Sequence, residues 1–156
     1  MDYHWKRINR RIKRPNCSLS FWSVELYREK ITYKTDDFIL TGITDFLVSK
    51  GLEYSKKPYF FIQEFKKSIK NDDPRPQLLA ELIAAIELND FKQIKGAYIV
   101  GENWNFVILE KLNVNCYQYF ISHTFNATHF NELQQIYKNL CFIKQEIIDI
   151  QKTSLP

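Results

Sequence analysis

The sequence has few of the residues that build disulfide or zinc frameworks. Its 156 residues include three cysteines and three histidines. Cys17, Cys116 and Cys141 are odd in number and widely spaced, which excludes a disulfide scaffold and matches no zinc-binding spacing. The histidines are equally scattered, and none pairs with a cysteine or a carboxylate at a metal-ligand spacing. We therefore expect free, buried thiols in a reducing cytoplasm and ordinary polar histidines.

Long apolar runs, internal repeats and low-complexity segments are also missing. No stretch approaches the ~20 apolar residues of a membrane-spanning helix, and the basic start is followed by Pro15 rather than by the apolar run of a signal peptide. Hydrophobic residues make up 45% and charged residues 26%, which is typical of a globular protein and excludes a disordered or collagen-like chain. We expect a cytoplasmic protein without membrane association, with one domain over 18–156.

The positive charge of the chain is concentrated at its beginning. The net charge is +4, yet residues 1–14 hold six lysines and arginines against Asp2 alone, a local charge of +5. The other residues, 16 basic and 17 acidic, sum to −1. A basic arm over 1–17 indicates an anionic partner such as nucleic acid. A solvated terminus without a partner is the alternative interpretation.

The pattern of apolar and turn residues predicts a mixed fold of helices and strands. We expect helices over 18–30, 77–88 and 130–150, and strands over 38–49, 59–66, 95–100, 104–109 and 117–122. The last helix is expected to bury one face with Leu133, Ile136, Tyr137 and Leu140. This order predicts an α/β or α+β fold with a mixed sheet, in which the strands over 38–49 and 59–66 form an antiparallel pair.

Three charged residues near the ends of that strand pair form a candidate site. Glu64 and Lys66 share a face of their strand because side chains alternate, while Phe65 is expected to point into the core. A hairpin centred near 54–55 would place Asp45 opposite Glu64. Neighbouring carboxylates are tolerated best beside a cation, and their hard oxygen atoms suit Mg²⁺. The alternative is an exposed cross-strand ion pair between Glu64 and Lys66.

The helix over 77–88 can extend this site. Gln77 and Glu81 are four residues apart and form a polar stripe distinct from the Leu/Ile face. The first turn of the helix follows the Glu64–Lys66 strand closely, so it can lie beside the site and favour an anion. Lys67, Lys70 and Arg75 lie in the connection and could contact a phosphate backbone, although a solvated polar surface explains these residues equally well.

These motifs together resemble the PD-(D/E)XK nuclease superfamily. The matching segments are Gly42-Ile-Thr-Asp45, Glu64-Phe-Lys66 and the helix that carries Gln77, followed by a strand–turn–strand segment from Gly96. The resemblance covers about residues 20–121, with Thr44 in place of the proline of the first motif. It implies a restriction-endonuclease-like fold, a mixed central β-sheet flanked by helices.

The resemblance also implies residue roles. Asp45, Glu64 and the backbone carbonyl of Phe65 would hold Mg²⁺, or Mn²⁺ in its place. Lys66 would orient or activate the attacking water, and Gln77 would position the lysine, the water or a phosphate. The accessory acidic candidates are Glu25, Glu29 and Glu81.

The expected function is therefore Mg²⁺-dependent hydrolysis of a phosphodiester, with DNA rather than RNA as the substrate. Two alternatives stay open. The first is a catalytically inactive nuclease-like module that serves as a protein- or nucleic-acid-binding subunit. The second is a nucleic-acid binder that uses the basic arm over 1–14. A homodimer and a complex with a partner subunit are both compatible with the sequence.

Overall fold

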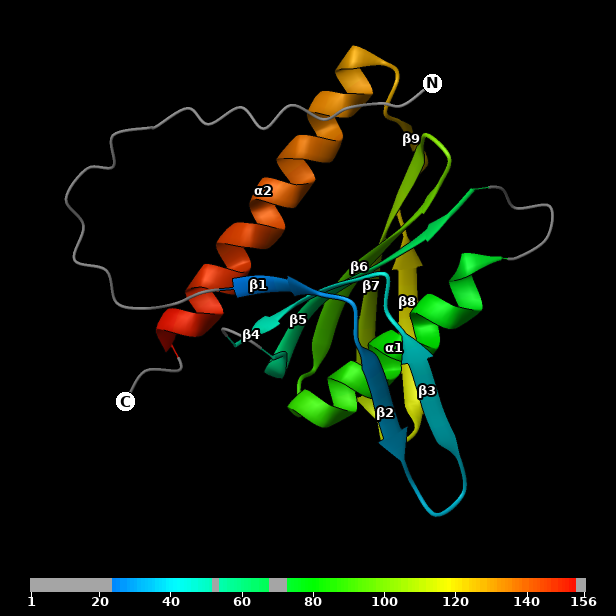
Figure 1. Ribbon diagram of the computed structural model, residues 1–156, viewed down its shortest axis with the longest axis vertical. Coiled ribbons are helices and arrows are strands. Elements are labelled where there is room, and N and C mark those ends of the chain that lie inside the picture. The colour runs from blue at the N-terminus through cyan, green and yellow to red at the C-terminus, as the bar shows by residue number, and fades with distance from the viewer. Residues whose placement is uncertain (1–23, 52–53, 68–72, 154–156) are drawn as a thin grey trace.

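The computed structural model describes residues 24–51, 54–67 and 73–153 (Figure 1). The chain is a mixture of helices and strands, which confirms the expected α+β class. The elements in chain order are β1 (Val24–Tyr27), β2 (Lys30–Lys34), β3 (Ile39–Ile43), β4 (Phe46–Lys50), β5 (Lys56–Lys66), α1 (Pro74–Asn89), β6 (Gln93–Val100), β7 (Asn103–Asn113), β8 (Cys116–Ile121), β9 (Phe125–Asn126) and α2 (Phe130–Thr153).

Seven of the strands form one mixed sheet. Its order is β1-β4-β5-β6-β7-β8, and the short β9 also pairs with β7. The pair β5–β6 is parallel, and α1 makes the crossover between these two strands, because parallel neighbours need a long connection. The other pairs of this sheet are antiparallel. β2 and β3 form a separate two-stranded sheet.

The two helices pack on opposite faces of the large sheet (Figure 1). Apolar side chains of α1, such as Leu78 and Leu82, join Ile62 and Val107 of the sheet in one core cluster. On the other face, Ile136, Ile143 and Ile147 of α2 pack with Phe61 and Phe106. The β2–β3 hairpin lies against α1 and adds Ile31 to the first cluster. α1 is therefore enclosed between the sheet and the hairpin.

Local sequence explains where α1 begins and ends. The side chain of Asp73 accepts a hydrogen bond from the backbone N–H of Arg75, which caps the first turn, and Pro74 stands where a helix tolerates proline. Asp90 adopts the left-handed conformation at the C-terminal end. The helix begins three residues before the expected Gln77, so Gln77 lies in its first turn.

The first expected helix, over 18–30, is wrong wherever the structure describes it. Residues 24–27 form β1, which pairs antiparallel with β4, and β2 begins at Lys30. The segment contains Val24 and Tyr27, residue types that favour strands. Pairing with β4 therefore decides its structure over the weak helical pattern. Residues 18–23 lie outside the described part of the chain.

The later elements agree better with the expectations, with one division. The expected strand over 38–49 is split into β3 and β4, with Thr44 and Asp45 between them. β4 and β5 form the predicted antiparallel pair. The other expected strands and the C-terminal helix are present with small changes at their ends.

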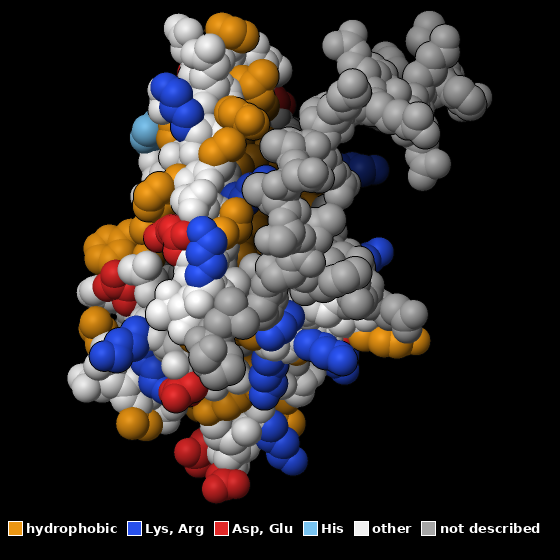
Figure 2. Space-filling view, turned by 90° about the vertical axis from the view of Figure 1, so that its left-hand side faces the viewer, with side chains coloured by type: hydrophobic (Ala, Val, Ile, Leu, Met, Phe, Trp, Pro, Cys, Tyr) orange, Lys and Arg blue, Asp and Glu red, His pale blue; other side chains and the backbone are white. Residues whose placement is uncertain are grey.

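Three burial predictions are wrong. Phe65 is 46% exposed rather than in the core, because this end of β5 extends beyond the residues that α2 covers. On α2, Leu133 and Tyr137 are exposed instead of buried, and hydrophobic side chains are visible on that side of the molecule (Figure 2). The described cysteines, Cys116 and Cys141, are free and exposed rather than buried.

No helix in the described part of the chain is both long enough and apolar enough to cross a membrane.

Candidate functional site

Asp45 lies at the sharp junction between β3 and β4. The preceding Thr44 is fully buried and holds the junction in place through Glu29. Its backbone N–H and its hydroxyl both donate to the Glu29 carbonyl, at 3.0 and 3.2 Å, and its hydroxyl accepts from the Glu29 N–H. Asp45 is therefore set at the point where the chain passes from the hairpin into the large sheet.

Asp45 and Glu64 meet as the register predicted. Phe46 pairs with Gln63 and Leu47 with Ile62, so Asp45 comes next in line with Glu64. The Asp45 N–H donates to Glu64 Oε1 at 3.2 Å, and the Phe65 N–H donates to Asp45 Oδ2 at 2.9 Å. The Glu64 carboxylate thus accepts from the backbone of Asp45, and the Asp45 carboxylate accepts from the backbone of Phe65, the residue after Glu64. These two bonds fix the orientation of both side chains.

Glu64 is fully buried rather than exposed at the edge of the sheet. Its carboxyl group contacts the carboxyl group of Glu81. Glu81 is a residue of α1, is only 1% exposed and lies against Gly42 of β3. Burial, together with the hydrogen bond to Glu81 and the charge of Glu81, raises the pKa of Glu64 to about 9. Burial also raises the pKa of Glu81. The pair therefore retains a proton at neutral pH.

Gln77 connects this pair to Lys66. Its amide Nε2 donates to Glu81 Oε1 at 3.2 Å and to the Ile43 carbonyl at 3.4 Å. These bonds orient the amide so that its Oε1 accepts from Lys66 Nζ at 3.3 Å. Asp45, Glu64, Glu81, Gln77 and Lys66 therefore belong to one continuous hydrogen-bonded network, although they come from three separate segments of the chain.

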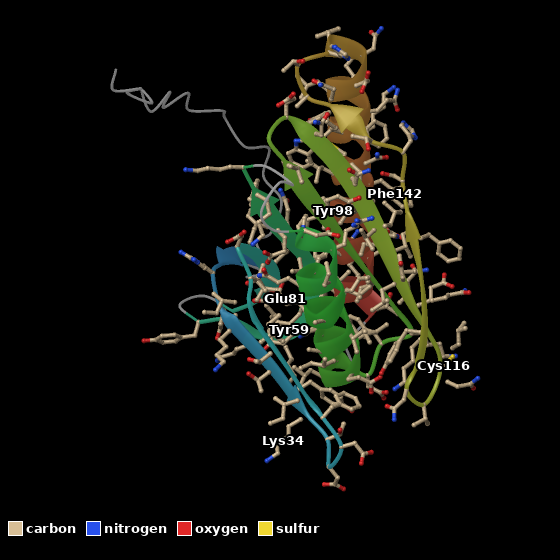
Figure 3. All side chains as sticks on the ribbon, turned by 90° about the vertical axis from the view of Figure 1, so that its right-hand side faces the viewer. Lys34, Tyr59, Glu81, Tyr98, Cys116 and Phe142 are labelled. Carbon is tan, nitrogen blue, oxygen red and sulfur yellow. The ribbon has the colours of Figure 1, made fainter. Side chains whose placement is uncertain are left out.

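Gly42 is a structural requirement of this network that the sequence argument did not assign. A Cβ atom at this position would lie 2.2 Å from Glu81 Oε1. The glycine therefore allows the buried carboxyl group of Glu81 to approach the backbone of β3, as Figure 3 shows where Glu81 points from α1 toward the strands. A lone glycine inside a strand pattern can signal such a close approach. The polar stripe of Gln77 and Glu81 predicted that Glu81 lies near the site, but not that its carboxyl group is buried against Glu64.

The donor set is compatible with a magnesium ion. As carboxylates, Glu64 and Glu81 each have one buried oxygen, Oε2, without a hydrogen-bond donor. Such an atom must be matched by a proton or a cation. Among the described residues, no group of three or more Asp, Glu, His and Cys side chains is arranged to enclose a metal. Mg²⁺ does not need such a cage, since it binds one or two carboxylates and keeps several waters.

The other residues predicted for the site lie at the edge of the network or outside the residues that the structure describes. Glu29 supports Thr44 with its backbone. The side chain of Glu25 and all of Lys70 lie outside the described structure. Arg75 donates hydrogen bonds to both carboxylate oxygens of Asp73, and Lys67 is exposed near the site. The expected basic arm over 1–14 also lies outside the described residues.

Comparison with protein-family models, curated proteins and solved structures finds no match to this chain.

Proposed function

We propose that the protein is a Mg²⁺-dependent phosphodiester hydrolase that acts on DNA, built on a restriction-endonuclease-like fold. The observation that carries the proposal is the network that joins Asp45, Glu64, Glu81, Gln77 and Lys66. It brings two strand-end carboxylates and a lysine, in the order and spacing of the nuclease motif, to one position in the fold. Buried carboxyl groups that are partly unsatisfied and whose pKa is shifted, as in Glu64 and Glu81, concentrate at functional sites.

In this proposal the carboxylates of Asp45 and Glu64, with the Phe65 carbonyl, would hold Mg²⁺ or Mn²⁺. A bound ion would supply Lewis acidity and lower the pKa of a coordinated water. The backbone N–H groups of Asp45 and Phe65 orient the two carboxylates before any ligand arrives. Because the carboxylates are already oriented, no free energy is spent on reorienting them during the reaction.

Lys66 would carry the positive charge beside the phosphate. Gln77 holds its ammonium group through Oε1, and the Gln77 amide is itself oriented by Glu81 and Ile43. An ammonium group in this position can stabilise the charge that develops on the phosphate oxygens and can orient the attacking water. Gln77 and Glu81 are positioning residues in this account.

A second candidate is a catalytically inactive module of the same fold that binds protein or nucleic acid. It is favoured by the fact that Asp45 Oδ2 and Glu64 Oε1 each already accept a backbone hydrogen bond. A site satisfied from within can persist as structure after its activity is lost.

The two candidates are separated by an activity measurement on the full chain. Purified protein is incubated with single-stranded and duplex DNA and with RNA, in Mg²⁺, in Mn²⁺ and after chelation with EDTA. We expect cleavage of DNA that requires the metal and that is lost in Glu64→Ala. A correctly folded wild-type protein that cleaves none of these substrates would refute the hydrolase and favour the inactive module.

A further inference from the structure

Within the part of the chain that the structure describes, the outer edge of β8 lacks the protection that sheet edges normally have. Its inner edge pairs with β7, and no strand among the described residues pairs with its outer edge. An unpaired edge presents a row of backbone donors and acceptors, which proteins usually protect with charged residues, proline or bulges. β8, with the sequence Cys-Tyr-Gln-Tyr-Phe-Ile, contains neither charge nor proline, and the one irregularity in its pairing lies before it, at 111–113 of β7.

The side chains of β8 are also exposed on both faces of the sheet. Tyr119 pairs with Leu109 and Ile121 pairs with Val107, so both lie on the face of the sheet that α1 packs against. Their side chains are 52% and 38% exposed. Phe120 points to the other face and is 54% exposed. The strand lies at the margin of the molecule in Figure 3, where Cys116 marks one end. Large apolar side chains exposed around an open backbone edge are typical of an interface.

We propose that two copies of this chain associate by antiparallel pairing of β8 with β8. A two-fold axis perpendicular to the sheet keeps each face on its own side, so each residue must oppose one of the same face. The register that includes all three exposed residues within β8 is centred on Tyr119. It places Tyr119 against Tyr119 of the second copy, and it opposes Gln118 to Phe120 and Tyr117 to Ile121.

Two features favour a second copy over other occupants. Because β8 is uncharged, self-pairing opposes no like charges across the strand pair. Tyr119 at the axis would form an aromatic cross-strand pair, which stabilises antiparallel strands. An extended peptide from a different protein would use the same backbone edge and is an outcome of the test.

The dimer would merge the two sheets into one and place both copies of α1 on the same face. The two candidate sites would then open toward the same side of the assembly. This inference rests on the edge of the sheet alone and stands independently of the proposed hydrolase function.

The first test is the molar mass of the full chain by light scattering at micromolar concentration. We expect twice 18.7 kDa for the wild type and 18.7 kDa for Tyr119→Lys, because the substitution places two lysines opposite each other at the axis. Ile39→Lys, on the exposed face of β3, is the matched control and should keep the dimer mass. Circular dichroism checks that both variants are folded. A monomeric wild type would overturn the proposal and leave the edge to another protein, and a dimeric Tyr119→Lys would overturn it as well.

The second test addresses the register. Cys17, Cys116 and Cys141 are replaced by serine, and one new cysteine is introduced by Tyr119→Cys or, as a control, by Tyr137→Cys on the exposed face of α2. A short thiol cross-linker should join two Tyr119→Cys chains and leave Tyr137→Cys as single chains. Cross-linking through position 137 but not through position 119 would place the interface on α2 and contradict the proposal.

Discussion

Helix α1 carries two glutamates, six positions apart, whose pKa values shift in opposite directions. Near its C-terminal end, Glu87 accepts hydrogen bonds from Lys111 Nζ at 2.8 Å and from the Tyr117 hydroxyl at 2.7 Å. Burial alone would raise the pKa of Glu87, but these two bonds outweigh it and lower the pKa. Nearer the N-terminal end, Glu81 faces another carboxyl group, Glu64, and burial raises the pKa of both.

The difference indicates that the cluster around Glu87 stabilises the fold, whereas the pair of Glu64 and Glu81 is a candidate functional site. At Glu87 every part of the cluster has a matching partner, so it contributes stability. At Glu81 and Glu64, one oxygen of each carboxylate has no donor, which costs stability unless a proton or a cation is supplied. Proteins violate local rules of this kind mainly at functional sites. The same helix thus carries a structural cluster and a candidate site.

The largest effect should come from exchanging the lysine of each cluster. Lys66→Met removes the ammonium group beside the proposed phosphate position, and we expect cleavage of DNA to fall by ~10²–10³-fold. Lys111→Met is the matched control and should leave the rate unchanged, as measured on protein confirmed to be folded. Equal loss of activity in both variants would remove the distinction between the clusters.

The effects of the same two variants on stability should have the opposite order, with the larger loss in Lys111→Met. Lys111→Met leaves the Glu87 carboxylate without its cation, and we expect the free energy of unfolding to fall by about 1–3 kcal/mol. Lys66→Met should lower it less, because the hydrogen bond from Lys66 Nζ to Gln77 Oε1 is 3.3 Å long, whereas Lys111 Nζ and Glu87 Oε2 form an ion pair at 2.8 Å. Urea denaturation followed by circular dichroism measures both values, and a larger loss in Lys66→Met would assign the structural role to the candidate site.

A third prediction concerns the close approach at Gly42. Gly42→Ala would place a Cβ 2.2 Å from Glu81 Oε1, and we expect a loss of about 1–3 kcal/mol in the free energy of unfolding from overpacking. In a Glu81→Ala background the same substitution should cost much less, because the clashing carboxyl group is absent. A double-mutant cycle by urea denaturation measures this coupling, and additive effects would show that Glu81 does not require the glycine.

A fourth prediction concerns the dependence of stability on pH. The unfolded chain releases the Glu64 proton near pH 4.5, whereas the folded protein keeps it up to about pH 9. Between these values the folded state binds more protons, so this pair lowers stability as the pH rises, by at most ~1.4 kcal/mol per pH unit. Glu64→Gln should flatten this dependence. If wild type and variant change in parallel across this range, the shared proton is absent.

Much of the site could be predicted because it depends on local spacing. The centre of the β4–β5 hairpin fixes which residues oppose one another, and Asp45 lies next in line with Glu64 as this centre predicts. The expected start of the helix at Gln77 is three residues later than the observed start at Pro74, yet it still places Gln77 at the N-terminal end of α1, where Gln77 binds Lys66. These features follow from strand alternation and turn residues within short segments.

The remaining features depend on long-range packing that local patterns do not contain. The helix expected at 24–27 is a strand, β1, because it pairs with β4, 20 to 26 residues further along the chain, and a local pattern does not contain that pairing. Phe65 was expected inside because the extent of α2 over the sheet was unknown. The burial of Glu64 beneath Glu81 requires the β2–β3 hairpin to fold over α1, and only Gly42 gave an indication of that approach.

The most direct test of the candidate site is Mg²⁺ binding by titration calorimetry on the full chain, without any substrate. We predict binding to the wild type, loss of binding in Glu64→Ala, and unchanged binding in Glu87→Ala, whose glutamate belongs to the structural cluster. Absence of Mg²⁺ binding to folded wild-type protein, or equal binding to all three proteins, would contradict the assignment of Asp45 and Glu64 as a metal site.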